Sequence, residues 1–287
     1  MTTTALSTAA GRTDTSNRGR RQALWVACGA HALHDGLTDT LYLLLPILQT
    51  EFALTYAAIG VLRALYAGAM AGLQVPAAKL AQRIGGPRML AAGTAVAGAA
   101  YLALGASSTL AILVLALILG GLGSSTQHPI ASSLVAAAYQ GPRSRGALGT
   151  YNFAGDLGKM ALPAITAGLI ALMSWRLAAG AVGIIALLGS GAILLAPWCV
   201  AAAGDKRTGA SRSKSKPPES TDQRTDPPRS GFTLLLAIGV IDSATRMGFL
   251  TFLPFLLRAK GAGLPEIGVA LTLVFAGGAA EIGRAHV

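Results

Sequence analysis

Residues 23–48 are hydrophobic and long enough to cross a lipid bilayer as a helix, which needs about 20 mostly apolar residues. At about 100° per residue, the polar side chains of this segment share one helical face. They are His31, His34, Asp35, Thr38, Asp39 and Tyr42. Ionisable groups at mid-membrane are costly and normally face a protein interior or a water-filled cavity. We therefore expect this helix to lie inside a bundle whose other helices enclose the polar face.

Long apolar runs recur along the whole chain, in which 53% of the residues are hydrophobic and only 12% are charged. This pattern indicates a polytopic, all-α transmembrane protein and excludes both a soluble domain and a single membrane anchor. We predict eight spans, at residues 23–48, 56–78, 89–105, 109–139, 148–172, 177–200, 232–257 and 265–280. The fourth run is long enough to tilt or to end in a loop.

The net charge of +11 would favour nucleic-acid binding in a soluble protein. Here most Lys and Arg residues lie in alternate loops between the apolar runs, as the positive-inside rule requires. The N-terminal tail, residues 1–22, is on the basic side, whereas the opposite loops hold only Arg176, Arg258 and Lys260. We expect an inner-membrane protein with a cytoplasmic N-terminus and no nucleic-acid partner.

A repeat with an offset of 208 residues relates the two ends of the chain. Pro46-Ile-Leu and Ala58-Ile-Gly-Val match Pro254-Phe-Leu and Glu266-Ile-Gly-Val. Between the copies, residues 201–231 are rich in Ser, Pro and charge, which predicts a disordered cytoplasmic linker, with attraction to the membrane surface as an alternative. The unit is thus six spans: a bundle at 23–200, then the first two helices of a second bundle at 232–280. Parallel repeats of this size are typical of secondary transporters.

The last seven residues, 281–287, differ in character from the rest of the chain. Glu-Ile-Gly-Arg-Ala-His-Val can be translated from GAGATCGGAAGAGCACACGTC, a common sequencing-adapter sequence. We interpret them as an adapter artefact and exclude them from functional argument; an authentic short terminus is the alternative. On the artefact interpretation, residues 1–287 alone should not transport.

The turn after the second span resembles a cytoplasmic signature of the major facilitator superfamily, Gly-x-Leu-Ala-Asp-Arg-x-Gly-Arg-Arg. It reads Ala-Lys-Leu-Ala-Gln-Arg-Ile-Gly-Gly-Pro-Arg-Met-Leu at residues 78–90. Arg83, Gly85 and a displaced Arg88 match this gating-loop signature, while Gln82 stands where the family has an acid. The resemblance covers residues 23–280 and implies the twelve-span fold of that family, of which this chain holds about eight spans.

Within that superfamily, His34–Pro46 and Gln127–Ser133 resemble the fosmidomycin-resistance-type efflux proteins, and Phe275–Ala280 fits as well. This resemblance implies proton-coupled efflux of a small toxic compound. The alternatives are a proton-coupled importer of a small organic anion, with the same fold, and a non-transporting receptor or scaffold.

Asp35, Asp39 and His34 are the candidates for proton coupling, because buried carboxyl and imidazole groups can load and release protons. Asp39 has a second interpretation, a structural ion pair with Arg63 at a similar depth on the next span. That pairing would leave Asp35 as the better proton site.

Other polar residues of the spans are candidates to line the substrate cavity. They are His31, Tyr42, Gln127, His128, Lys159, Asp242 and Arg246. Lys159 also lies three residues after Asp156, so a structural pair is the alternative to a contact with an anionic substrate. Asp242 and Arg246 pose the same choice, and a guanidinium matches a carboxylate or phosphonate well.

The sequence contains no HExxH, CxxC, GxSxG, P-loop or dinucleotide-binding motif, so we expect no enzyme, metal or cofactor. The proton gradient is the expected driving force. The expected partners are a small-molecule substrate and the lipid bilayer, and we expect the full-length protein to be a monomer.

Overall fold

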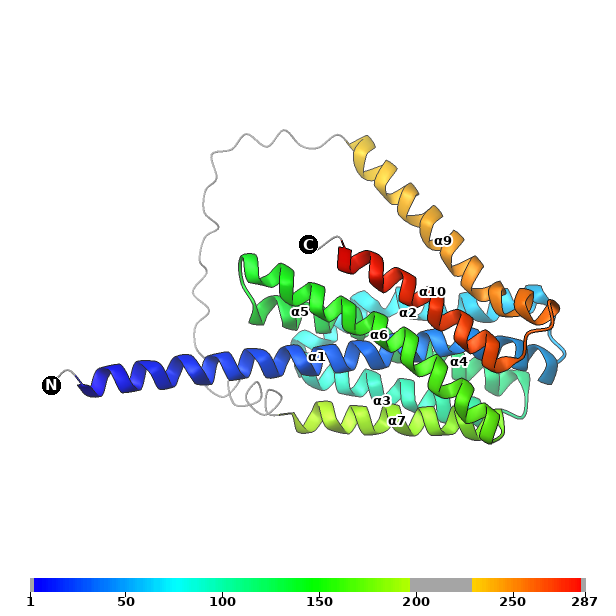
Figure 1. Cartoon of the computed structure of the whole chain (residues 1–287), viewed down its shortest axis with the longest axis horizontal. Coiled ribbons are helices and arrows are strands. Elements are labelled where there is room, and N and C mark those ends of the chain that lie inside the picture. The colour runs from blue at the N-terminus through cyan, green and yellow to red at the C-terminus, as the bar shows by residue number, and fades with distance from the viewer. Residues whose placement is uncertain (1–2, 197–228, 285–287) are drawn as a thin grey trace.

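The structure, a computed structural model, describes residues 3–196 and 229–284 and shows only helices there (Figure 1). They are α1 (Thr3–Glu51), α2 (Tyr56–Ile84), α3 (Gly86–Gly105), α4 (Leu110–Ser124), α5 (Gln127–Ala138), α6 (Pro142–Leu172), α7 (Trp175–Leu195), α9 (Arg229–Ala259) and α10 (Leu264–Arg284). The all-helical prediction is confirmed for these residues. Nearly all of the predicted 201–231 linker lies outside them.

Six spans in the described part are long and apolar enough to cross a membrane: α2, α3, α4 with α5, α6, α7 and α9. Two predicted spans do not meet that standard by composition. The polar face of α1 lowers its hydropathy, and the apolar part of α10 is short, Leu264–Gly278. Large hydrophobic side chains on the outside of the helices, such as Leu188 and Leu195, suit contact with lipid tails.

The helix with the polar face, α1, lies at the centre of the bundle (Figure 1). It packs mainly against α6 and α5, with further contacts to α7, α9 and α3. Its residues between Ala27 and Leu48 are mostly buried, as expected for a helix whose polar groups must be kept from lipid. The helix also continues back to Thr3, so the predicted N-terminal tail is helical from that residue on. Adding residues to a helix that is already nucleated costs little free energy.

The fourth predicted span is divided at residues 125–126 into α4 and α5. Pro129 explains the break, because it has no N–H to donate to the carbonyl of Ser125. Local bonds stabilise the bend: the hydroxyls of Ser125 and Thr126 donate to the carbonyls of Leu122 and Gly123. The break brings the start of α5, with Gln127 and His128, beside the middle of α1.

The predicted gating-loop signature forms the tight turn between α2 and α3. Gly85 adopts φ 99°, a conformation that favours glycine, and its N–H donates to the carbonyl of Ala81. Gln82, Arg83 and Arg88 are exposed around this turn. We call this side of the bundle the Gly85 end and the opposite side, where α1 finishes, the Pro46 end.

The ends of the helices follow the 208-residue repeat. α1 ends at Glu51 and α9 at Ala259, while α2 begins at Tyr56 and α10 at Leu264. Pro46 and Pro254 lie inside helices at equivalent positions. The two helix–turn–helix units are therefore copies in structure as well as in sequence.

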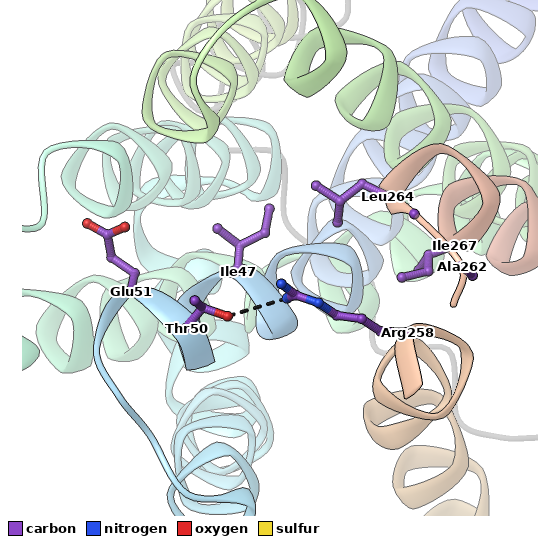
Figure 2. Close-up of a pocket in the computed structure, with 8 residues that line it drawn as sticks. Ile47, Thr50, Glu51, Arg258, Ala262, Leu264 and Ile267 are labelled. Carbon is purple, nitrogen blue, oxygen red and sulfur yellow. Dashed lines mark hydrogen bonds between the residues drawn. The ribbon is translucent and has the colours of Figure 1, made fainter. Parts of the chain in front are cut away.

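The two copies touch at the Pro46 end. Arg258 of α9 donates to the carbonyl of Pro46 at 3.1 Å and to the hydroxyl of Thr50 at 3.4 Å. Thr50 occupies the position in the first copy that Arg258 occupies in the second. A pocket of about 310 Å³ opens between the end of α1 and the α9–α10 turn (Figure 2). Towards the Gly85 end α9 diverges from α1 (Figure 1), and residues 231–246 are all exposed. The copies are thus closed against each other at one end and separated at the other.

This arrangement predicts which cysteine pairs a short thiol cross-linker can join. In a background with Cys28 and Cys199 replaced by serine, Thr50→Cys with Arg258→Cys should cross-link readily. The matched pair Leu24→Cys with Phe232→Cys, also 208 residues apart but at the Gly85 end, should not. After the chain is cleaved within residues 201–231, a cross-link keeps the two fragments together, and gel mobility shows whether they have separated. Efficient cross-linking of the second pair alone would contradict contact at the Pro46 end and separation at the Gly85 end.

Candidate functional site

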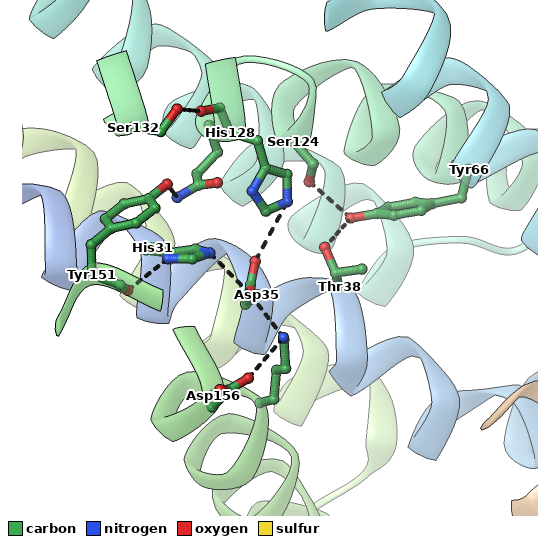
Figure 3. Close-up of polar contacts among 11 residues, drawn as sticks. His31, Asp35, Thr38, Tyr66, Ser124, His128, Ser132, Tyr151 and Asp156 are labelled. Carbon is green, nitrogen blue, oxygen red and sulfur yellow. Dashed lines mark hydrogen bonds and ion pairs between the residues drawn. The ribbon is translucent and has the colours of Figure 1, made fainter. Parts of the chain in front are cut away.

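A charged cluster lies between α1, α5 and α6, centred on the buried carboxylate of Asp35 (Figure 3). Its oxygen Oδ2 lies 3.2 Å from His31 Nε2 and 3.3 Å from Lys159 Nζ, and Oδ1 lies 3.8 Å from His128 Nε2. Lys159 also donates to Asp156 Oδ1 at 3.0 Å. The Asp156–Lys159 pair, one of the two interpretations of Lys159, is therefore confirmed. The sequence analysis missed the second contact of Lys159, which bridges this pair to Asp35.

The hydrogen bonds of His31 imply a proton shared with Asp35. His31 Nδ1 lies 2.8 Å from the backbone carbonyl of Tyr151, which can only accept, so Nδ1 carries hydrogen. In a neutral ring Nε2 is then an acceptor. Its 3.2 Å contact with Asp35 Oδ2 needs one proton between them, on either the imidazole or the carboxyl.

Aromatic and amide side chains position His31 from the opposite side. The ring of Tyr151 stacks on the imidazole at 4.1 Å, and the ring of His128 meets it edge-on at 5.4 Å. Gln127 donates to the Tyr151 hydroxyl at 2.8 Å. Gln127 is buried, whereas the side chain of His128 is 48% exposed. His128 is thus the member of the cluster most open to an incoming molecule.

Two glycines let α6 approach α1 closely enough to form the cluster. A Cβ on Gly155 would lie 2.7 Å from His31 Cε1 and 2.8 Å from Asp35 Oδ2. A Cβ on Gly158 would lie 1.9 Å from the backbone oxygen of Ala32. The contact between the two backbones therefore sets the distance from Lys159 to Asp35.

His34, one of the three proton-coupling candidates, contacts α3 and not Asp35. Its Nε2 lies 2.8 Å from the hydroxyl of Thr94, which itself donates to the carbonyl of Leu90. The hydroxyl therefore accepts, and His34 Nε2 carries hydrogen. Nδ1 is buried without a partner among the described residues. His34 joins α1 to α3, and it is His31 that contacts Asp35.

The predicted Asp39–Arg63 ion pair is absent from the described part of the chain. Arg63 instead donates to the Tyr42 hydroxyl at 2.9 Å and lies over the rings of Tyr42 and Tyr66, at 4.8 and 5.2 Å. Its Nε and Nη1 have no hydrogen-bond partner among the described residues. Similar depth in the membrane does not make two side chains neighbours: Arg63 reaches α1, but at Tyr42 and not at Asp39.

Polar groups of three helices form a second, uncharged set near Arg63. The Tyr66 hydroxyl lies 3.0 Å from that of Thr38 and 2.8 Å from that of Ser124 (Figure 3). The sequence analysis noted Thr38 but not Tyr66 or Ser124. A buried tyrosine needs a partner for its hydroxyl, so Tyr66 on the polar side of α2 was the available signal.

The two candidates on α9 lie apart from these clusters. Asp242 and Arg246 are both exposed and form no ion pair with each other in the described structure. The structural-pair interpretation of these residues is therefore wrong for this conformation. Arg246 lies within electrostatic range of Asp39 and Tyr42 on α1.

His31, Asp35 and His128 together resemble a metal-ligand set, since their ligand atoms lie within 4.8 Å of one another. The positive charge that such a set would attract is already present, because the Lys159 ammonium contacts the same carboxylate. The cluster is therefore better described as a hydrogen-bonded ion network than as a metal centre.

The helical fold and the buried ion network define a polytopic membrane protein whose charged groups lie inside the bundle. The sequence profile of the Major Facilitator Superfamily matches residues 27–285. The chain belongs to this family of membrane transporters. No curated protein matches the sequence, and the resemblance to one efflux subgroup stays a prediction.

The fold is similar to that of a solved structure, a bacterial homolog of the human lysosomal transporter Spinster in an inward-facing and unoccupied conformation. The TM-score is 0.68 and the sequence identity is 18%. The match covers 90% of this chain and 60% of the other, so the chain spans about three fifths of that relative's length. At this identity the likeness supports the fold and not the substrate.

Proposed function

We propose that the protein is a proton-coupled secondary transporter of the inner membrane that exports a small toxic compound in exchange for protons. The observation that carries this proposal is the position of Asp35. One buried carboxylate is shared by His31, Lys159 and His128, at the helix interface where a proton would alter the packing of α1 on α6. An intramembrane ionisable group in such a place is a functional-site candidate.

Alternating access fits the contacts between the two repeat copies. With the N-terminus in the cytoplasm, as the distribution of Lys and Arg favours, the Pro46 end faces outward. The copies touch there and separate towards the Gly85 end, an arrangement open to the cytoplasm. A cargo entering from that side meets His128 first, because its side chain is the most exposed of the cluster.

The sign of coupling follows from what a proton does to this network. Neutralising Asp35 removes the charge that attracts Lys159 and His128, which weakens the α1–α6 connection. A proton thus favours the state in which the connection is loosened, and an exported cargo must favour the intact state. Coupling requires opposite biases on one two-state equilibrium. Loading of the proton from outside then favours cargo release and return inward.

Lys159 supports a second candidate function, a proton-coupled importer of an organic anion, in which proton and cargo move in the same direction. If Lys159, released by protonation of Asp35, bound the anion, then proton and cargo would favour the same state. The two functions share one fold and one site and differ only in whether the fluxes of proton and cargo run in opposite or the same directions.

The experiment uses the protein with any further helices that its gene encodes, expressed in cells that lack their main exporters. A panel of growth inhibitors identifies a compound to which expression confers resistance. Everted vesicles loaded with a pH-sensitive dye then report proton movement when this compound is added. For export, we expect the compound to release protons from acid-loaded vesicles while it accumulates inside them.

The outcomes separate the alternatives. Proton and compound moving in the same direction would establish the importer and overturn the export proposal. Binding of the compound without any flux would favour the receptor or scaffold. Vesicles from cells carrying the empty vector are the control for passive permeation.

A further inference from the structure

Arg63 is a buried charge that takes no part in the ion network around Asp35. Its residue is only 6% exposed, and Nε and Nη1 have no hydrogen-bond partner among the described residues. A guanidinium carries five N–H donors, and the structure gives it one acceptor, the Tyr42 hydroxyl. A buried cation without a hydrogen-bonded counter-charge is strongly disfavoured, so this one calls for an anion.

The surroundings of Arg63 select the geometry of a ligand. The guanidinium is held over the rings of Tyr42 and Tyr66, at 4.8 and 5.2 Å, an arrangement that keeps a cation in place without consuming its N–H groups. The hydroxyl of Tyr66 joins it to Thr38 and Ser124. The pre-positioned donors of a guanidinium match the oxygens of a carboxylate or a phosphate.

A second arginine, Arg246 of the other repeat copy, lies within electrostatic range of the residues beside Arg63. Arg246 of α9 is exposed, and it acts electrostatically on the same Asp39 and Tyr42 as Arg63 does. Asp39 is buried there and pairs with neither arginine in the described structure. Lys159 and Asp35 also act on Asp39, but Lys159 is already paired with Asp35 and Asp156. The two guanidiniums and the Asp39 carboxylate then leave one positive charge uncompensated, which suits a ligand with one negative charge.

We propose that Arg63 and Arg246 bind one small oxyanion, a carboxylate or a phosphate group, between the first and the second repeat copy. This inference rests on the proposed transport function and adds the charge class of the cargo. The site lies on the α2 and α9 sides of α1, whereas the ion network of Asp35 lies on its α5 and α6 sides. The proton and the anion therefore bind to different residues, the proton to the network of Asp35 and the anion to Arg63 and Arg246. The anion links the two copies directly.

The test measures binding of simple anions to the full-length protein purified in detergent. Acetate and inorganic phosphate are titrated at constant ionic strength, with the unfolding temperature followed by tryptophan fluorescence. We expect a saturable rise in unfolding temperature with at least one of the two anions, since a ligand of the folded state stabilises it. Arg63→Gln should abolish the rise and Arg246→Gln should weaken its apparent affinity at least tenfold.

Asp39→Asn provides a readout that does not depend on removing an arginine. It deletes the one negative charge beside the site, so it should tighten the binding of the anion several-fold. The matched control is Arg176→Gln, which removes another arginine stacked on an aromatic ring, but one already paired with Glu51. This variant should bind the anion as the unchanged protein does.

Two results would overturn the anion site: no saturable effect of either anion on the unchanged protein, or an unchanged affinity in both Arg63→Gln and Asp39→Asn. Neither depends on proton coupling, which the vesicle assay measures separately. Loss of anion binding with proton-driven flux intact would refute this inference alone. Anion binding by a protein that moves no cargo would refute the transport proposal alone.

Discussion

Replacing Asp35 by asparagine is expected to abolish proton-driven flux while leaving the protein folded. The amide has nearly the same shape as the carboxylate, but it carries no charge and cannot bind the coupling proton that the proposed mechanism places on Asp35. We expect net transport driven by a pH gradient to fall at least a hundredfold. Exchange of labelled for unlabelled cargo without a gradient, which needs no net proton movement, should be retained.

The matched control for this change is Glu266→Gln, which neutralises an exposed carboxylate in the first turn of α10. It should leave both gradient-driven flux and exchange unaltered. If Asp35→Asn lost exchange and net flux equally, Asp35 would be required for cargo binding or assembly and not for coupling. If it kept its gradient-driven flux, the proton site would have to lie elsewhere.

Adding one methyl group at Gly158 should weaken the packing of the whole N-terminal bundle. The new Cβ would lie 1.9 Å from the backbone oxygen of Ala32 and 2.5 Å from its Cα. Backbone atoms cannot rotate away as a flexible side chain can, so α1 and α6 must separate. Overpacking usually costs about 1–3 kcal/mol, occasionally more, and we expect Gly158→Ala to reach the upper end of that range.

Thermal unfolding in detergent, together with the yield of membrane-inserted protein, measures this effect. Gly168→Ala on the same helix is the matched control, because nothing lies within 4 Å of its added Cβ. Alanine there should be neutral or stabilise the helix by up to about 1 kcal/mol. Equal stability of the two variants would show that α1 and α6 do not pack as closely as described.

The sequence was sufficient to predict the central place of α1, because its polar face cannot contact lipid. The 208-residue repeat and the helix ends followed from two prolines and one short motif. The sequence analysis expected the fourth run to tilt or to end in a loop, and Pro129 was the residue that could have located the break at 125–126. These features are local or periodic, so they can be predicted from a single chain.

The partner of Asp35 was also predictable in principle. His34 precedes Asp35 directly, and consecutive residues on a helix point about 100° apart. His31 is four residues earlier and therefore faces it, as the 3.2 Å contact confirms. The sequence analysis placed all three side chains on one broad face and did not separate neighbours in the sequence from neighbours in space.

Contacts between helices were the part that the sequence could not supply. Arg63 and Asp39 lie at similar depths, but depth alone does not say which helices are adjacent or which way a side chain points. Lys159 illustrates the opposite case: its pairing with Asp156 follows from a spacing of three residues. Its bridge to Asp35 depends on the packing of α6 against α1.

The 208-residue repeat also shows that duplication was followed by divergence in chemistry. The positions equivalent to His31, Asp35 and Asp39 are Gly239, Ser243 and Met247. The second copy therefore kept the proline inside its first helix and the helix ends, but it has no ionisable group at any of these three positions. If the proposed proton coupling holds, proton handling can be inherited and altered through the first copy alone, while the second is free to vary with the shape and charge of the cargo.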